Sequence, residues 1–285
     1  MIGILNINKP KGITSFDVVA AVKKTLGTKA VGHFGTLDPM GEGVLPIGVG
    51  KATRLFDIML KKDKIYEATF KFGYCTDTLD SEGQTVVCGG RIPCLSEITD
   101  TANELIGRQL QRPPAYSAKN INGRRAYELA RQGKEVELAP CDVEIYAIKA
   151  ETTGSADTFK FTIHCSSGTY IRSVCRDLAE KLGTYAVMTS IKRLRCGAFD
   201  IKDSVTLQEL SSLKENALLK VDAALTEIPK VTLCDVCYEY LLKGLKMQGR
   251  GISYERFALY CKNELFGIAK INENDKIDII SYLRD

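Results

Sequence analysis

The chain has 285 residues, a net charge of +4 and 45% hydrophobic residues, enough to bury the core of one large domain plus a small one. Its composition excludes collagen, a coiled coil and extended disorder. No run approaches the ~18 uninterrupted apolar residues of a membrane span, and the N-terminus MIGILNINKPKG lacks the regions of a secretory signal. We therefore expect a soluble, cytoplasmic protein with no membrane partner.

In chain order, the first clear element is a helix over residues 15–26. Thr14 and Asp17 have the spacing of a capping box, and Gly27 is placed as a C-terminal cap. Residues 31–50 hold six of the 24 glycines, and ordering so much glycine is entropically costly. We expect a loop there that passes close to a ligand.

From Tyr66 the pattern has period two, which predicts a half-buried strand. Further strands are expected at 84–88, 142–149 and 158–166, and helices at 95–107 and from Ile171 to a stop at Gly183. This order predicts an α+β fold with a mixed, largely antiparallel sheet flanked by helices. A change of composition near 226–232 and short strand-like runs over 257–281 predict a small C-terminal β module.

The ten cysteines are scattered, and His33 and His164 are the two histidines. Cys234 and Cys237 form a lone C-x-x-C without the second pair that structural zinc generally needs. We expect buried free thiols in a reducing compartment, no metal and no cofactor. His164, on the polar face of its strand, is assigned to structure.

The densest segment for chemistry is GHFGTLDPMGEG at residues 32–43. Asp38 lies among glycines, and Pro39 biases it toward an extended conformation. Taken alone, Asp-Pro in a loop is usually turn chemistry, so this fragment leaves both interpretations open. The nearby GVGKAT is no phosphate loop, because Leu45 and Ala52 stand where that motif requires Gly and Ser or Thr.

Basic residues gather between Arg108 and Lys134, where seven cations face one acid, Glu128. The cations are Arg108, Arg112, Lys119, Arg124, Arg125, Arg131 and Lys134. Such asymmetry favours a polyanionic partner. A solvated basic face explains the charge equally well.

Several segments together resemble the bacterial tRNA pseudouridine-55 synthases, the TruB family. The resemblance covers about residues 3–200 with its spacing intact. It rests on INKPKG, GHFGTLDPMGEG with VLPIGVGKATR, KIYEA, TDTLDSEG, QRPPAYSAKNINGRRAYELARQG, SSGTYIRSVCRDLAEKLG and IKRLR. Met40 and Gly41 replace the small or aliphatic residues usual there, and Lys119 is displaced by one from a lysine that the family often has at Asn120.

The resemblance implies that Asp38, Tyr66 and Arg172 are catalytic. Asp38 would be the essential carboxylate, and Arg172 would keep it ionised in a closed pocket; the alternative for Arg172 is an ordinary surface salt bridge. Tyr66 would stack on the target base, or else be a core aromatic. Asp80 would brace Arg172.

The same resemblance implies a set of substrate contacts. Tyr170 and Leu194 would line the pocket, and Lys9 would support the loop or contact RNA. His33 would wedge into the T loop in place of an everted base, its alternative being an ordinary loop histidine. Arg124 and Arg125, within the basic segment, would contact the T stem and loop.

The implied activity is isomerisation of uridine 55 in the T loop of tRNA, on a flipped-out base, with tRNA as the partner of a monomer. Residues 1–228 would be the catalytic domain with the pseudouridine synthase fold, and 229–285 a short PUA-like domain. One alternative is a guide-RNA-dependent catalytic subunit of related sequence, against which the compact C-terminal region argues. Another is an inactive RNA-binding or chaperone protein, against which the intact Asp38, Tyr66 and Arg172 argue.

Overall fold

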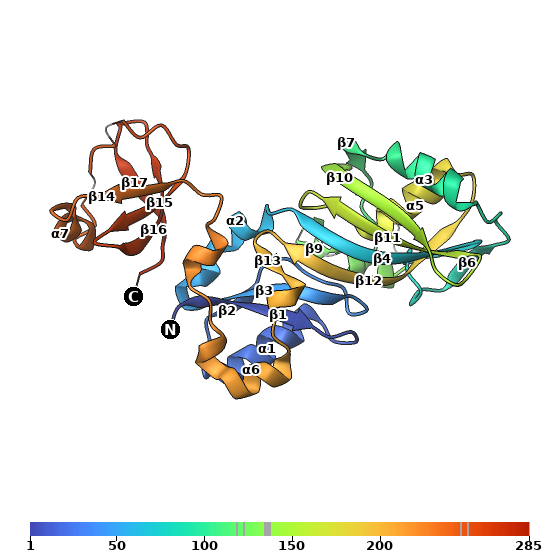
Figure 1. The fold of residues 1–285 in the computed structure, drawn as a ribbon, viewed down its shortest axis with the longest axis horizontal. Coiled ribbons are helices and arrows are strands. Elements are labelled where there is room, and N and C mark those ends of the chain that lie inside the picture. The colour runs from blue at the N-terminus through green and yellow to red at the C-terminus, as the bar shows by residue number, and fades with distance from the viewer. Residues whose placement is uncertain (118, 122, 134–137, 246, 250, 285) are drawn as a thin grey trace.

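The structure is a computed structural model that describes residues 1–117, 119–121, 123–133, 138–245, 247–249 and 251–284. Within this part of the chain, a nine-stranded sheet and a separate four-stranded sheet carry most of the architecture (Figure 1). Helices flank the large sheet, so the predicted α+β class is confirmed. No helix of the described residues is long and apolar enough to span a membrane.

The large sheet is mixed but mainly antiparallel, as predicted. In spatial order its main strands are β1 (Gly3–Lys9), β3 (Glu42–Val49), β12 (Ala186–Cys196), β4 (Lys64–Phe72), β11 (Thr158–Cys165), β10 (Cys141–Thr152) and β7 (Gly107–Gln111). β2 (Val31–His33) pairs with β3, and β13 (Phe199–Asp200) pairs with β12. Parallel pairing occurs between β12 and β3, where Arg193 lies opposite Gly43.

The prediction of a ligand-contacting loop over residues 31–50 is wrong for much of its length, because β2 and β3 fall within it. The glycine at position 43 has φ +100°, and a Cβ there would lie 2.3 Å from the carbonyl oxygen of Arg193. Gly43 therefore permits close approach of two strands rather than of a ligand. The chain leaves the sheet between these strands, and this shorter loop carries Asp38.

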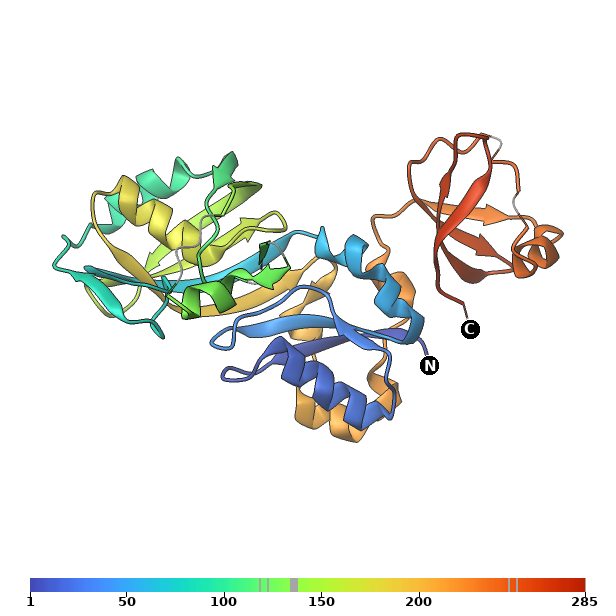
Figure 2. The same ribbon diagram turned by 180° about the vertical axis from the view of Figure 1, so that it is seen from behind.

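Two pairs of helices cover different parts of the sheet. Helix α1 (Ser15–Leu26) packs with α6 (Leu207–Leu213) beside β1 and β2 (Figure 2). Its predicted bounds are confirmed, with the capping box of Thr14 and Asp17 and with Gly27 at φ 63°. Helices α3 (Leu95–Asn103) and α5 (Ile171–Lys181) contact each other and pack on β10, β12 and β4.

The core under α5 is formed by the inward-facing side chains of β4, where buried and partly exposed residues alternate. Tyr66, Ala68, Phe70 and Phe72 point inward and are at most 8% exposed. Phe70 stacks on Phe161 of β11 with ring centroids 4.3 Å apart, a favourable aromatic arrangement. Strand β4 thus anchors both the core and the wall of the site described below.

Shorter elements complete the catalytic part of the chain. They are the helices α2 (Phe56–Leu60) and α4 (Ala126–Arg131), the 3-10 helices at Gly50–Leu55, Ile201–Asp203, Lys214–Ala217 and Val221–Ala224, and the hairpins β5 (Tyr74–Thr76) with β6 (Thr85–Cys88) and β8 (Asn120–Ile121) with β9 (Arg124–Arg125). The helix predicted over 95–107 ends at Asn103, and Gly107 at φ +112° begins β7.

The C-terminal module is a second sheet with its own core. Its strands are β14 (Lys230–Leu233), β15 (Phe257–Cys261), β16 (Glu264–Ile271) and β17 (Ile277–Tyr282), beside helix α7 (Cys237–Leu242). The strand-like runs predicted over 257–281 are confirmed. Figure 1 shows this module standing apart from the large sheet near α2. The Tyr260 hydroxyl donates to the Asp222 carboxylate, and Arg54 donates to the carbonyl of Tyr282 at 2.8 Å.

All ten cysteines are free, as predicted, but their burial was predicted wrongly for six of them. Cys165, Cys175, Cys196 and Cys261 are buried. Those in the β5–β6 hairpin, before α3, at the start of β10 and in the C-x-x-C are partly or fully exposed. The C-x-x-C sulfurs are 3.3 Å apart.

Candidate active site

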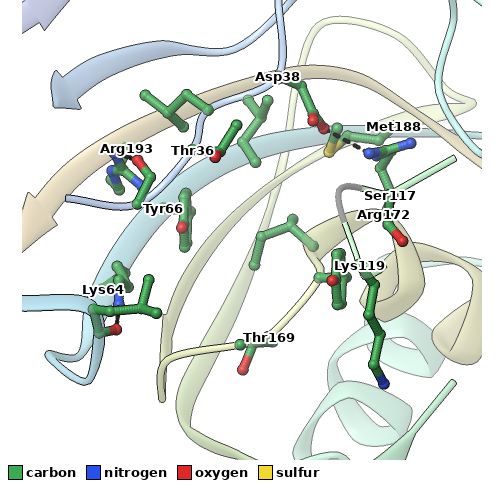
Figure 3. A pocket seen from close by; sticks show the side chains of 17 residues that line it. Thr36, Asp38, Lys64, Tyr66, Ser117, Lys119, Thr169, Arg172, Met188 and Arg193 are labelled. Atoms are coloured by element: carbon green, nitrogen blue, oxygen red, sulfur yellow. Dashed lines mark hydrogen bonds and ion pairs between the residues drawn. The ribbon is translucent and has the colours of Figure 1, made fainter. Parts of the chain in front are cut away.

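A cavity of about 370 Å³ opens between β4, β12 and the first turn of α5 (Figure 3). It unites the three residues that the sequence marked as catalytic, Asp38, Tyr66 and Arg172. The other lining residues are Gly35, Thr36, Leu37, Leu60, Lys64, Ser117, Lys119, Gly168, Thr169, Tyr170, Ile171, Met188, Ile191 and Arg193. Two central strands, the loop that carries Asp38 and the start of α5 therefore meet at one site.

Asp38 lies in the loop between β2 and β3. The side chains of Ser15 and Lys9 hold the backbone of this loop in place by hydrogen bonds. The Ser15 hydroxyl donates to the Leu37 carbonyl at 3.0 Å and accepts from the Leu37 amide at 2.9 Å. The Lys9 ammonium donates to the carbonyls of Pro39 and Gly41 at 3.3 and 2.5 Å. The Asp38 side chain itself remains 39% exposed, so its carboxylate is open to a ligand.

Arg172 holds that carboxylate from the first turn of α5. Its Nη2 lies 2.8 Å from Asp38 Oδ2, and its Nη1 lies 3.5 Å from Asp80 Oδ2. The same guanidinium donates to the backbone carbonyls of Thr78 and Tyr116 at 3.1 and 3.0 Å. With its side chain 8% exposed, Arg172 is a buried, multiply bonded cation rather than part of a surface salt bridge.

Tyr66 forms a wall of the cavity from the inward face of β4. Figure 3 shows its ring between the Asp38–Arg172 pair and Arg193. Burial raises the pKa of Tyr66 to about 12, and the nearby Arg193 guanidinium opposes this rise. The phenol is therefore protonated at neutral pH and presents a flat, largely apolar surface with one polar tip.

Lys9 lies under the Asp38 loop, and Tyr170 lies in the wall of the cavity. Lys9 is 0% exposed, which favours loop support over RNA contact, the two roles that the sequence left open. Burial lowers the pKa of Lys9 to about 8. Tyr170 lines the cavity at the N-cap of α5, and burial raises the pKa of its phenol.

Of the two residues predicted to line the pocket, Tyr170 does so and Leu194 does not; His33, Lys9, Asp80 and Arg124 also lie outside the cavity lining. His33 lies on β2, where burial and then the charge of Arg193 lower the pKa of its imidazole. Leu194 is the extra residue of a bulge in β12, between the pairs Arg193–Tyr66 and Arg195–Ile65. Because a bulge re-aims the side chains around it, Ile191 and Arg193 face the cavity instead.

Sequence reasoning passed over Ile191 and Arg193. Their i, i+2 spacing on a strand is the signal that could have placed both on one face. The bulge at Leu194 follows both residues, so their alternation is intact.

The basic segment lies beside the cavity and contributes Ser117 and Lys119 to its lining. Lys119 lines the cavity and donates to the Ala139 carbonyl at 2.9 Å. Arg124 is exposed on β9, where the backbone of Arg125 pairs with Asn120. Lys134 lies outside the described residues. In the described part of the chain, no group of three or more His, Cys, Asp or Glu side chains could hold a metal.

The geometry can serve chemistry on a nucleoside. A cavity in the range of ~300–1,000 Å³ accepts a small ligand, and here a flat aromatic ring faces an accessible, ion-paired carboxylate. Such a carboxylate can attack a carbon or remove a proton. Exposed cations next to the opening suit a phosphate backbone.

Solved structures define the class of this fold. The chain resembles a protein in "Crystal Structure of a Cbf5-Nop10-Gar1 Complex" with a TM-score of 0.76 and 26% identity, over 99% of this chain and 85% of that one. It also matches the fold of a chain in "Structure of H/ACA RNP bound to a substrate RNA containing 2'-deoxyuridine", with a TM-score of 0.76 and 24% identity over the same shares. The fold is that of RNA pseudouridine synthases.

Sequence comparison narrows the class to one family. The model of the TruB family pseudouridylate synthase N-terminal domain matches residues 23–171, and that of the tRNA pseudouridylate synthase B C-terminal domain matches 172–228. A "tRNA pseudouridine synthase B" of Clostridium novyi is 41% identical over 248 residues, covering 87% of this chain and 86% of the relative. Another, from Thermosipho melanesiensis, is 39% identical over 288 residues, covering 97% and 93%. The chain belongs to the TruB family and is a pseudouridine synthase.

Proposed function

We propose that this enzyme converts uridine 55 in the T loop of tRNA to pseudouridine, with Asp38, Tyr66 and Arg172 as its catalytic residues. Membership of the TruB family supports the isomerisation of tRNA uridine. The observation that carries the assignment of the site is the Asp38–Arg172 ion pair of 2.8 Å at a cavity walled by Tyr66.

The reaction exchanges one bond to the sugar for another. The C1′–N1 bond breaks and its electron pair leaves with uracil. The base then turns, C5 bonds to C1′, and the proton on C5 is lost while N1 gains one. Asp38 either attacks covalently or removes a sugar proton to give a glycal-like intermediate. Because atoms and oxidation state are conserved, the isomerisation requires neither cofactor nor metal.

The target nucleotide must leave the stack to reach this cavity. Extruding a base costs a few kcal/mol, roughly, and contacts along the RNA offset that cost. We assign these contacts to the basic segment with Arg124 and Arg125, to Tyr170 at the cavity, and to His33 and Leu194 outside it. Binding should weaken steeply with salt, because phosphate contacts release counterions.

The two sheets belong to two domains with different roles. Residues 1–228 form the catalytic domain, and 229–285 form a PUA-like domain that adds an RNA contact. We infer a monomer, since the basic segment leaves its exposed Arg124 available to RNA rather than to a second copy. A tRNA substrate and ten free thiols are consistent with the cytoplasm.

Tritium release tests the proposal. A tRNA transcript carrying uridine labelled at C5 is incubated with the enzyme alone. Wild type should release tritium and Asp38→Asn should not, and a transcript with cytidine at position 55 should give no release. Equal release from Asp38→Asn and wild type would remove Asp38 from the mechanism.

Two rival functions give different results in the same assay. Release that requires an added guide RNA would indicate a guide-dependent subunit. Tight binding of tRNA with no release from wild type would indicate an RNA-binding or chaperone protein.

A further inference from the structure

Arg193 is a buried cation that has no role in the proposed function. It is 1% exposed, and among the described residues it forms no ion pair. Burying a guanidinium without a carboxylate costs free energy. Arg193 lies on β12 directly across from Tyr66 on β4, so the two side chains share one face of the sheet. Both line the cavity (Figure 3).

The guanidinium of Arg193 closes the loop that carries Asp38. Its Nε donates to the Val44 carbonyl at 2.6 Å and its Nη2 to the Gly35 carbonyl at 3.1 Å. These two carbonyls stand on either side of Asp38 in the chain. Lys9 holds the middle of the same loop, so Arg193 fixes its two ends relative to β12.

The same side chain also reaches the aromatic wall of the cavity. The positive charge of Arg193 opposes the rise in the pKa of Tyr66 that burial causes. Because the two residues are paired directly across β12 and β4, one planar group bonds to the supports of Asp38 and lies beside Tyr66.

We propose that Arg193 is a positioning residue that sets the geometry between Asp38 and Tyr66. This inference rests on the proposed function for the roles of those two residues. Arginine has five N–H donors in a fixed plane, whereas lysine concentrates its donors on one atom. Arg193 can thus bond to Gly35 and Val44 at once while its charge stays beside Tyr66. A misplacement of about 1 Å in such a site can cost roughly 10²-fold in rate.

Kinetics provide the first test, with Arg193→Met and Arg193→Lys. The single-turnover rate of tritium release should fall about 10²-fold in Arg193→Met and by less in Arg193→Lys. RNA affinity should stay unchanged, because a side chain 1% exposed cannot contact phosphate. An unchanged rate, or a loss of affinity that equals the loss of rate, overturns the proposal. Arg195→Met is the matched control on the same strand, since Arg195 binds Asp63 at 3.1 Å and should leave the rate unchanged.

A spectrum of the tyrosine ring provides a second test that needs no catalysis. Protein labelled with ¹³C at Cζ of tyrosine is compared by NMR, with Tyr66→Phe identifying the Tyr66 resonance. The resonance should shift in Arg193→Met and Arg193→Lys and stay in place in Arg195→Met. An unmoved resonance in a folded Arg193 variant contradicts the proposal. If Arg193→Met does not fold, Arg193→Lys carries both tests, because it keeps the charge.

The two tests separate this inference from the proposed function. Wild type that releases no tritium from T-loop uridine, while the Tyr66 resonance still responds to Arg193, would refute the substrate assignment alone. Normal wild-type release with an unresponsive Tyr66 would refute the role of Arg193 alone.

Discussion

At the residue scale, the site combines a fixed cation with an accessible acid. Arg172 is bonded to two backbone carbonyls as well as to Asp80, and its side chain is 8% exposed, against 39% for Asp38. The guanidinium therefore stays in place whether or not a ligand is bound. The carboxylate is aimed at the cavity before substrate arrives, which is the preorganisation that catalysis requires.

Arg172→Lys should lose activity although it keeps the charge. A lysine ammonium cannot bridge Asp38, Asp80 and two carbonyls, and the loss of charged hydrogen bonds predicts a fall of about ten- to a hundredfold in the rate of tritium release. Arg176→Lys is the control on the same helix; it contacts Asp177 rather than Asp38. Comparable losses in both variants would mean that α5 has merely been destabilised.

Lys9 should make stability depend on pH in a defined direction. The pKa of Lys9 falls from 10.5 to about 8 in the folded state because of burial. Between these values the unfolded chain binds more protons than the folded one, so the free energy of unfolding rises with pH. Compared with Lys9→Met, wild type should gain stability from pH 8 to about 10.5, as measured by urea unfolding. A constant difference between the two proteins over that range would contradict the burial of a charged Lys9.

At this scale, the sequence predicted the catalytic residues better than the other residues that line the cavity. Asp38 and Arg172 belong to separate motifs whose partnership the family resemblance implied, and the ion pair of 2.8 Å brings them together. The bulge at Leu194 depends on how three strands register. Single-chain periodicity contains no such information, so the position of Leu194 outside the cavity could not be predicted from the sequence.

At the scale of elements, the decisive contact is the short parallel pairing of β3 with β12. A side chain at Gly43 would meet the Arg193 carbonyl at 2.3 Å, and φ there is +100°. The pairing of β3 with β12 therefore requires glycine at position 43. Because β12 also pairs with β4, this pairing joins the two halves of the sheet. The Asp38 loop begins and ends at this same junction.

Gly43→Ala should destabilise the fold strongly. Strain at positive φ together with the clash predicts a loss of about 2–4 kcal/mol in the free energy of unfolding, measured in urea. Gly154→Ala is the matched control, because a Cβ at Gly154 meets no atom within 4 Å; its stability should change little. A stable, fully active Gly43→Ala would show that β3 and β12 can separate without consequence.

Elements with strong local signals were predicted closely. Helix α1 has a cap at each end, and β4 alternates without a break. The segment 31–50 was mispredicted in part because Gly43 is required by a neighbouring strand 150 residues away along the chain, at Arg193. Helix α3 ends early in a turn, where the amides of Leu105 and Ile106 donate to the carbonyls of Ala102 and Asn103, and Gly107 then begins β7.

At the scale of the whole molecule, hydrogen bonds join the C-terminal module to the rest of the chain at the edge of their contact. Tyr260 donates to Asp222, and Arg54 donates to the Tyr282 carbonyl. Ala258, Ile268 and Leu283 of the C-terminal module pack in the same apolar cluster as Ile4. The two sheets thus share part of one core.

Tyr260→Phe should loosen this junction. Removing the hydroxyl leaves Asp222 without that donor and should cost about 1–2 kcal/mol. Proteolytic cleavage within residues 226–229 should become faster, as followed by mass spectrometry of the fragments. Tyr254→Phe, at a tyrosine 48% exposed, should be cleaved like wild type. Equal rates for all three proteins would show that the hydroxyl does not secure the module.

The place of β12 in the sheet has a consequence for synthesis of the protein. β12 lies between β3 and β4, yet the ribosome makes it after every other main strand of the large sheet. A nascent chain that ends before residue 186 can pair β1 with β3 and β4 with β11, but these two halves have no strand between them. The half-built catalytic pocket then lacks Arg193 on one wall. Emergence of β12 joins the two halves of the large sheet and supplies the missing wall of the pocket in a single late step.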